Sequence, residues 1–159
     1  MTHEPPEVAT AEDAPAITAL LNDAYRPVES FFHRGPRTTI EIVRERIGRG
    51  AFLLRRTDGG AIGACVYVEP RGEDAYLGML AVAPRAQRGG TGAALVGDAE
   101  EFLRARGVTR VQLDVISLRA EQLLPFYERL GYRVCGQRPF EDPLLTQPCD
   151  LVLLEKPLG

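Results

Sequence analysis

The stretch Pro84-Arg85-Ala86-Gln87-Arg88-Gly89-Gly90-Thr91-Gly92 joins an apolar segment, 75–83, to a segment with helical periodicity, 91–106. Three glycines in four positions let the backbone turn tightly and approach a ligand without hindrance from Cβ atoms. The first amides of a helix have no acceptor within the helix, and the helix dipole adds partial positive charge there. A strand, a glycine-rich loop and a helix in this order therefore predict a phosphate or pyrophosphate site, to which Arg85 and Arg88 could add charge.

Two common nucleotide-binding motifs do not fit this loop. A Walker A loop requires lysine and then serine or threonine after its last glycine, whereas Gly92 is followed by two alanines. A Rossmann fingerprint requires a third glycine that is missing here, and it lies in the first strand-to-helix turn rather than in mid-chain. A glycine-rich connector that binds no ligand remains the alternative, because short motifs often arise by chance.

Periodicity and turn residues predict the other elements. Pro27 and the glycine and proline that follow it interrupt the first helical pattern, so 26–37 is expected to be a loop or a strained helical turn. Thr38 and Glu41 have the spacing of a capping box, which places the second N-cap at Thr38. Pro125 is expected to kink the last helix. The expected strands are 7–10, 51–56, 61–68, 75–83, 108–115, 132–138 and 149–156, and the expected helices are 13–25, 38–48, 91–106 and 118–130.

The order of these elements indicates the fold class. Three successive strands joined by short turns, from 51 to 83, predict an antiparallel meander. The strand, helix and strand between 75 and 115 predict a parallel pair. We therefore expect an α/β (α+β) fold with one mixed sheet. A length of 159 residues without repeats or linkers predicts a single domain, 1–159.

Composition excludes several classes of function. The formal net charge of −3 argues against a nucleic-acid partner, since such proteins carry a basic excess. No apolar run approaches the ~20 residues that a membrane span needs, and the first residues lack the pattern of a secretion signal. We expect a cytoplasmic protein with no membrane partner.

Cysteine and histidine offer little material for metal binding or nucleophilic catalysis. The three cysteines form no CxxC pair, and Cys65 and Cys135 lie in apolar stretches where burial is expected. The two histidines, His3 and His33, are too few for a histidine cluster or a Ser-His-Asp triad. No metal site is expected.

Two segments resemble a known family. The stretch 79–92 resembles the central motif of the GNAT superfamily of N-acetyltransferases, whose signature Q/R-x-x-G-x-G/A is met by Gln87, Gly90 and Gly92. The segment 124–132, which contains Phe126-Tyr127, resembles the family's FYxxxGF segment. Because the element order is also similar, the resemblance covers essentially the whole chain. It implies the GNAT fold: a mixed, mostly antiparallel sheet of about seven strands, splayed between strands 4 and 5 and flanked by about four helices.

The resemblance also implies an N-acetyltransferase with acetyl-CoA as co-substrate. Backbone groups of the strand before the loop would pair with the pantetheine arm, and the amides of 88–93 would hold the pyrophosphate. Tyr127 would protonate the leaving thiolate; alternatively, it only contributes to the apolar face of its helix. The implied coenzyme-binding residues are Leu80, Ala81, Val82, Gln87, Arg88, Gly89, Gly90, Thr91, Gly92, Ala93, Ser117, Phe126 and Tyr127.

The general base and the acceptor site are less well defined. Tyr76 stands where many family members carry a glutamate, so Glu73 and Asp74 are candidates acting through water, or else turn residues. Phe31, Phe32 and His33 are candidate acceptor-binding residues, although the two phenylalanines could equally fill the core. In GNAT folds the segments at 26–37 and 141–148 form the walls of the acceptor cleft, and Glu29, Glu141 or Asp142 there could attract a cation.

A small primary amine is the expected acceptor. The alternatives are a peptide or protein acceptor, a non-catalytic acyl-CoA sensor, and a nucleotide-binding regulator. A homodimer is possible.

Overall fold

Seven strands form one mixed sheet in the order β1-β2-β3-β4-β5-β7-β6. The structure is a computed structural model and describes residues 5–87 and 89–159. Along the chain the elements are β1 (Glu7–Val8), α1 (Ala14–Glu29), α2 (Ile40–Arg49), β2 (Ala51–Arg56), β3 (Ile62–Arg71), β4 (Asp74–Val82), α3 (Thr91–Arg104), β5 (Arg110–Ile116), α4 (Ala120–Arg129), β6 (Arg133–Pro139) and β7 (Asp150–Pro157). Short 3-10 turns lie at Ala11–Asp13, Pro84–Ala86 and Ser117–Arg119. The expected order and number of elements are confirmed.

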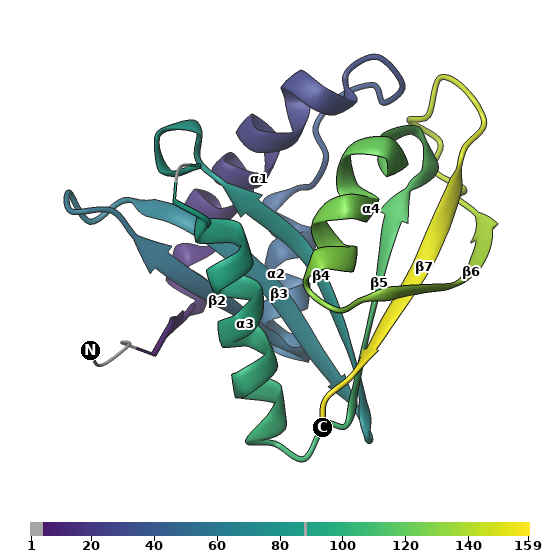
Figure 1. Ribbon diagram of the computed structural model, residues 1–159. Coiled ribbons are helices and arrows are strands. Elements are labelled where there is room, and N and C mark those ends of the chain that lie inside the picture. Colours follow the sequence, from purple (N-terminus) through teal and green to yellow (C-terminus); the bar gives the residue numbers. More distant parts are fainter. Residues whose placement is uncertain (1–4, 88) are drawn as a thin grey trace.

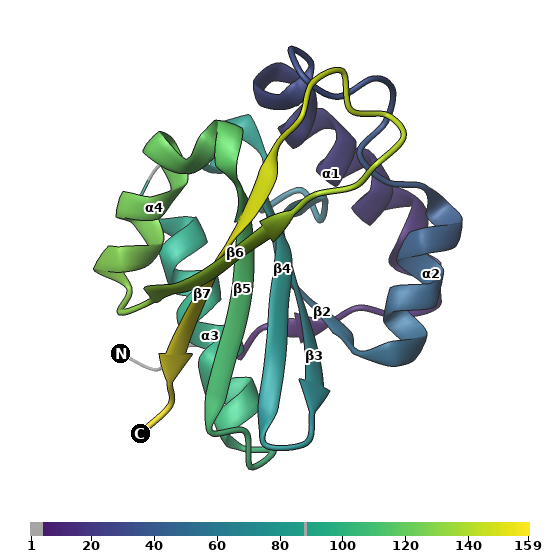
Figure 2. The same ribbon diagram turned by 90° about the vertical axis from the view of Figure 1, so that its right-hand side faces the viewer.

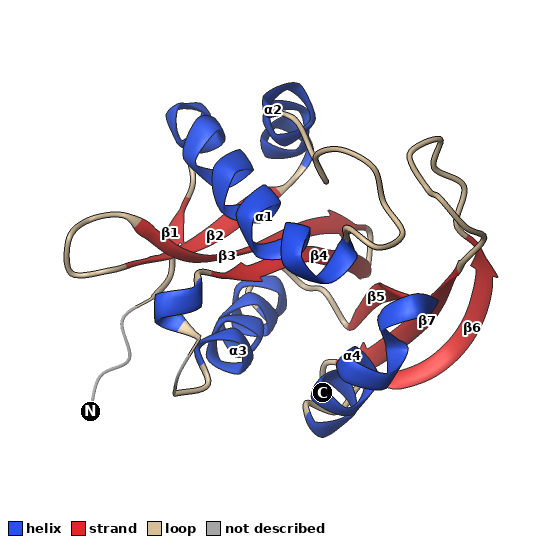
Figure 3. Ribbon diagram, turned by 90° about the horizontal axis from the view of Figure 1, so that it is seen from above, coloured by secondary structure: helices blue, strands red, loops and turns tan. Residues whose placement is uncertain are grey.

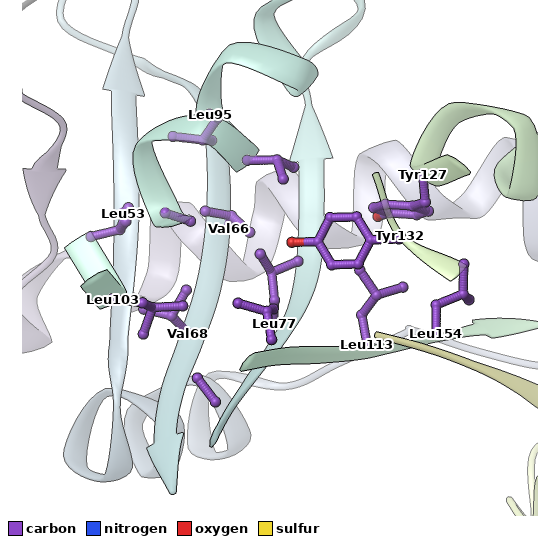
Figure 4. Close-up of a cluster of buried hydrophobic side chains, with 14 of the residues drawn as sticks. Leu53, Val66, Val68, Leu77, Leu95, Leu103, Leu113, Tyr127, Tyr132 and Leu154 are labelled. Carbon is purple, nitrogen blue, oxygen red and sulfur yellow. The ribbon is translucent and has the colours of Figure 1, made fainter. Parts of the chain in front are cut away.

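Helices cover both faces of the sheet. Figure 3 shows α1 and α2 on one face, and α3 and α4 on the other. Because side chains alternate along a strand, each central strand contributes to both sides. Leu53, Val66, Leu77 and Leu113, from four different strands, lie in the cluster that α3 covers (Figure 4). A second buried cluster under α1 and α2 contains Phe52, Leu54, Cys65 and Tyr67.

The sheet opens between β4 and β5. These parallel strands pair only from Asp74↔Arg110 to Tyr76↔Gln112. Beyond that point they diverge, and Figure 1 shows them close together at one end and apart at the other. Every other neighbouring pair in the sheet is antiparallel. The expected mixed sheet, splayed between strands 4 and 5, is therefore confirmed.

A bulge in β4 accompanies this divergence. Cys65 pairs with Ala81, but Tyr67 pairs with Gly78, so β4 contains one residue more than β3 across this interval. Met79 lies within the bulge with a φ of 51°, in the left-handed region that residues other than glycine rarely adopt. An extra residue in one strand bends that strand and removes it from regular pairing.

The first helix is longer than the sequence predicts. The pattern suggested an end at Tyr25 before Pro27, but α1 continues to Glu29 with Pro27 inside it. Proline removes one backbone donor and disfavours a helix interior. Here the last turn is held by contacts of Glu29, which is 5% exposed and pairs with two arginines. This extra turn brings Val28 and Glu29 to the functional site.

Two other predictions of local structure were wrong. The N-cap of α2 is Thr39, whose hydroxyl accepts a hydrogen bond from the Ile42 amide; Thr38 instead pairs through its backbone N–H and C=O with the Asn22 side chain. Cys135 is exposed rather than buried, because β6 is the edge strand of the sheet, whereas Cys65 in β3 is buried as expected.

Within the described residues, no helix is long and apolar enough to cross a membrane.

Candidate functional site

A cavity of about 1030 Å³ occupies the opening between β4 and β5. Its lining comes from α1 on one face of the sheet and from the start of α3 and from α4 on the other. The cavity therefore reaches through the sheet from one layer of helices to the other. The edges of β4 and β5 that face it are not paired with each other beyond Tyr76 and Gln112, so backbone groups there can pair with a ligand.

Contacts from α1 and β3 hold the bulge of β4 in place. The Tyr25 hydroxyl in α1 donates a 2.6 Å hydrogen bond to the carbonyl of Leu80. The Cys65 thiol lies 3.6 Å from the Met79 carbonyl in donor geometry. Leu80, Ala81 and Val82, the three residues expected to pair with the pantetheine arm, all line the cavity.

The glycine-rich loop begins where β4 ends. The Gln87 side-chain amide donates to the Val82 carbonyl at 3.0 Å and ties the loop to the strand. Gly89 and Gly90 have φ values of 81° and 73°, so both occupy the left-handed region that favours glycine. Gly90 is the N-cap of α3. The backbone geometry thus explains two of the three glycines that the sequence singled out.

The start of α3 faces the cavity. Gly90, Thr91, Gly92 and Ala93 all contribute to its lining, as does Gln87. Gly92 packs closely against α4, since a Cβ there would lie 3.7 Å from the Phe126 ring. Amides at this position carry the partial positive charge of the helix terminus, which suits a pyrophosphate group. The predicted residue Arg88 and the side chain of Arg85 lie outside the described parts of the structure.

Tyr127 lies in α4 at the cavity wall, beside the predicted residue Phe126. Its ring packs edge-on against Phe126 and Tyr132, with centroids 4.9 and 6.0 Å away (Figure 4 shows Tyr127 and Tyr132). Burial raises the pKa of the Tyr127 phenol to about 12. The hydroxyl therefore stays protonated at neutral pH and can act as a proton donor.

The structure does not bring the predicted general bases to the cavity. Glu73 lies in the exposed turn before β4, and its carbonyl accepts from the Thr109 amide. Asp74 forms an ion pair with Arg110 at 2.9 Å, and the bond to that guanidinium lowers the pKa of the Asp74 carboxyl. Glu73 is therefore a turn residue, which the sequence left open, whereas Asp74 is the first residue of β4.

Ser117 and the three candidate acceptor-binding residues also lie away from the cavity lining. The Ser117 hydroxyl accepts a hydrogen bond from the Asp150 amide at 2.9 Å. Phe31 is 59% exposed, whereas Phe32 is fully buried in a small cluster with Ile116 and Leu151. His33 is buried and pairs with Asp142 at 3.2 Å. Phe32 thus fills the core, as its alternative interpretation predicted.

Asp114 in β5 is a functional candidate that the sequence analysis missed. Val111, Leu113 and Val115 point into the core, so Asp114 between them faces the opposite side and lines the cavity. Burial raises the pKa of its carboxyl, and the nearby Arg138, at 3.7 Å, opposes that effect in part. A carboxylate with a raised pKa in a cavity is a candidate general base. The signal that could have found it was the alternation of β5, in which Arg110, Gln112 and Asp114 occupy one face of the strand and the apolar residues occupy the other.

A buried group of charges at the end of α1 was also missed. Glu29 lies 3.1 Å from Arg37 and 3.7 Å from Arg119, and all three side chains line the cavity. Burial raises the pKa of the Glu29 carboxyl, although both guanidinium groups act to lower it. Glu29 is thus already neutralised by arginines and is not free to attract a cation, which the sequence analysis considered.

Comparison with known families gives the class of this protein. The model of the acetyltransferase (GNAT) family matches residues 14–132, which include the bulged strand, the glycine-rich loop and Tyr127. The chain therefore belongs to the GNAT family and is an acetyl-CoA-dependent N-acetyltransferase. Comparison with curated protein sequences gives no significant match.

Solved structures agree in fold. The ribosomal-protein-S18-alanine N-acetyltransferase from Escherichia coli is 23% identical, with a TM-score of 0.77 over 96% of this chain and 92% of that one. A GNAT superfamily phosphinothricin acetyltransferase from Sinorhizobium meliloti, in complex with acetyl-CoA, is 16% identical, with a TM-score of 0.74 over 98% and 90%. A GNAT family acetyltransferase from Elizabethkingia anophelis with acetyl-CoA bound is 20% identical, with a TM-score of 0.63 over 76% and 84%.

Proposed function

We propose that this chain acetylates a primary amine of a small molecule by direct attack of the amine in a ternary complex with acetyl-CoA. The observation that carries the proposal is one cavity that joins the start of α3 to Tyr127 and Asp114. A coenzyme held at one end can present its acetyl group to an amine held at the other. Family membership gives the acetyl-CoA-dependent reaction, and the proposal adds the acceptor class and the direct attack.

The residues present fit acetyl-CoA. The left-handed glycines at 89 and 90 lead into α3, whose first residues line the cavity, and a helix N-terminus suits the pyrophosphate. The bulged strand at Leu80, Ala81 and Val82 has no partner strand on its β5 side, so its backbone groups would hold the pantetheine arm. When bound, acetyl-CoA supplies a thioester carbonyl that a free amine can attack.

Two side chains have the properties that the proton transfers require. Asp114, with its raised pKa, would take a proton from the acceptor ammonium, directly or through water. Tyr127, with a pKa of about 12, would donate its phenolic proton to the leaving thiolate. Asp114 supplies the acidic group that the sequence did not find, which weakens the alternative of a non-catalytic sensor.

The loops around the acceptor side favour a small acceptor. The Arg34 amide donates to the Leu144 carbonyl, and the Thr146 amide donates to the Phe32 carbonyl, each at 2.8 Å. The segment after α1 is thereby joined to the loop between β6 and β7, and Figure 2 shows the two side by side. A protein acceptor would have to thread a chain terminus past this connection.

Acetyl-CoA binding and thiol release test the proposal. We expect acetyl-CoA to raise the midpoint of thermal unfolding, and free CoA to be released with at least one member of a panel of amines, amino acids and aminoglycosides. A peptide with an N-terminal alanine should be a poorer acceptor. Faster acetylation of that peptide would favour a protein substrate, and coenzyme binding without thiol release for any acceptor would favour the sensor. Tight binding of ATP or NAD without acetyl-CoA binding would contradict the site itself.

A further inference from the structure

The acceptor half of the cavity is rich in arginine. Among the described residues that line the cavity, five are arginines and two are carboxylates, Glu29 and Asp114. Both carboxylates already lie within 4 Å of a guanidinium. We call the five side chains the cavity arginines: Arg37, Arg46, Arg71, Arg119 and Arg138.

Carboxylates nearby do not balance this charge. Arg46 and Arg71 share one further acid, Glu69, at 3.7 and 2.7 Å. Arg37 and Arg119 share Glu29, while Arg138 has Asp114. Within 4 Å, the five guanidinium groups have three carboxylate partners, which leaves an excess of positive charge. In a partly desolvated site such an excess attracts an anion and repels a second cation.

Arg37 is the best placed of these residues to bind an anion. Its guanidinium lies between two aromatic rings, with its central carbon 5.8 Å from the Tyr25 centroid and 5.9 Å from the Phe140 centroid. Its ionic contact within the described chain is made through Nε to Glu29 at 3.1 Å. Within the described chain Arg37 forms an ion pair with no carboxylate other than Glu29, and its side chain remains 33% exposed. A planar guanidinium held in this way suits bidentate binding of a carboxylate or phosphonate.

Arg37 also lies near the groups proposed for catalysis. Arg37 and Arg46 both act to lower the pKa of Asp114, although burial raises it more, and Arg37 acts in the same way on the Tyr76 phenol. Because Arg37 and Asp114 line the same cavity, one acceptor can place its anionic group at Arg37 and its amine toward Asp114. The excess positive charge also lowers the pKa of a bound ammonium, which favours the neutral, nucleophilic amine.

We infer that the acceptor is an amine that also carries an anionic group, a carboxylate or a phosphorus oxyanion, and that Arg37 binds this group. This inference rests on the proposed function and specifies its substrate class. An amino acid or an aminoalkylphosphonate has the required chemistry, whereas a polyamine does not.

Matched acceptors test the inference on the unmodified protein. Each amino acid in the panel is compared with its carboxamide and with the corresponding decarboxylated amine; aminoalkylphosphonates and a polyamine complete the set. Because hydrogen bonds to charged groups are the stronger ones, we expect kcat/KM for the preferred anionic acceptor to exceed that of its partners without the anionic group at least about tenfold. The carboxylate and phosphonate arms show which anion is favoured.

Two variants locate the effect. Arg37→Gln should remove most of this preference, mainly through a higher KM for the anionic acceptor, while acetyl-CoA still raises the unfolding temperature and so shows a folded protein. Arg133→Gln, on the exposed edge strand β6 and outside the cavity lining, should leave the preference unchanged.

Several outcomes would overturn the inference. Faster turnover of the polyamine or of the amines that lack an anionic group would do so and leave the proposed function intact. The inference would also be overturned if acetyl-CoA stabilised the protein but no anionic acceptor were acetylated. Absence of both acetyl-CoA stabilisation and thiol release would instead contradict the proposed function.

Discussion

The Tyr25 hydroxyl donates a 2.6 Å hydrogen bond to the backbone carbonyl of Leu80, 55 residues along the chain. This contact links the first helix to the bulge that separates β4 from β5. It positions the strand edge that would bind the coenzyme, and it depends on the part of α1 adjoining Pro27. The bulge also contains Met79 at a φ of 51°, so its shape requires support from neighbouring elements.

Removal of this hydroxyl should therefore weaken both fold and coenzyme binding. We expect Tyr25→Phe to lower the free energy of unfolding by about 1–2 kcal/mol, since a carbonyl in a partly buried site loses its partner. The KM for acetyl-CoA should rise as the bulge loosens. Urea unfolding and initial-rate kinetics measure the two effects; unchanged values for both would show that the bulge does not need this contact.

Tyr127→Phe tests the proton donor. Burial raises the Tyr127 pKa to about 12, so the phenol is protonated throughout the neutral range. Loss of a general acid should lower kcat by about 100-fold. The ring and its packing remain, so stabilisation by acetyl-CoA should be retained. A variant with unchanged kcat would limit Tyr127 to a packing role.

Asp114→Asn tests the general base through the pH profile. Because the Asp114 pKa is raised, the wild-type kcat/KM should fall as pH decreases through a value above the ordinary ~3.9 of aspartate. The asparagine variant should lose about 100-fold in rate and lack this acidic limb. A profile identical to that of the wild type would remove Asp114 from the mechanism.

The same substitution should increase stability at neutral pH. A carboxyl whose pKa is raised by folding stabilises the fold below its unfolded pKa, and this contribution is lost as pH rises through the folded pKa. The ionised form of Asp114 is therefore unfavourable in the native state, and a neutral amide relieves it. Urea midpoints should favour the variant at neutral pH and converge near about pH 4. A less stable variant at neutral pH would mean that the contact with Arg138 outweighs burial.

Variants of two glycines, one at the N-cap of α3 and one inside that helix, form a matched pair. Gly90 has a φ of 73°, so Gly90→Ala should cost about 1 kcal/mol and weaken acetyl-CoA binding, since alanine disfavours the left-handed region. A Cβ at Gly97, inside the helix, would meet no atom within 4 Å. Gly97→Ala should stabilise the protein by about 1 kcal/mol and leave coenzyme affinity unchanged. Equal effects of both variants on acetyl-CoA affinity would contradict the special role of the loop.

Another matched pair of variants tests the buried hydrogen-bond network around Glu100 in α3. Lys156, the one lysine of the chain, donates to both oxygens of Glu100 at 2.9 and 3.1 Å, and the Tyr132 hydroxyl donates to the same carboxylate at 2.9 Å. Glu100→Ala should lower the free energy of unfolding by about 3 kcal/mol because it leaves both donors without a partner. Glu101→Ala removes only a surface pair with Arg104 and should change stability by less than about 1 kcal/mol. Similar losses in the two variants would show that the buried network contributes little.

Local errors in the sequence analysis have a common cause. The end of α1, the N-cap of α2 and the exposure of Cys135 each depend on residues distant in the chain. Glu29 is held by Arg37 and Arg119, and Thr38 is held by Asn22. Cys135 lies on β6, which follows β5 and α4 in sequence but occupies the edge because β7 is inserted between β5 and β6.

The sequence alone predicted the coenzyme half of the site, and its residues line one cavity of the fold. Gln87, Gly90, Gly92, Phe126 and Tyr127 fall in short segments whose spacing is set by one strand, one loop and one helix, so local patterns were sufficient. Only the tertiary structure decided the acceptor half, because Asp114 and the cavity arginines come from separate elements with no common motif. Their proximity arises from the divergence of β4 and β5, which places α1, α2, β5 and β6 around one opening. Opposite charges that are far apart in sequence then neutralise each other in part, and the remaining positive charge is a property of the folded cavity.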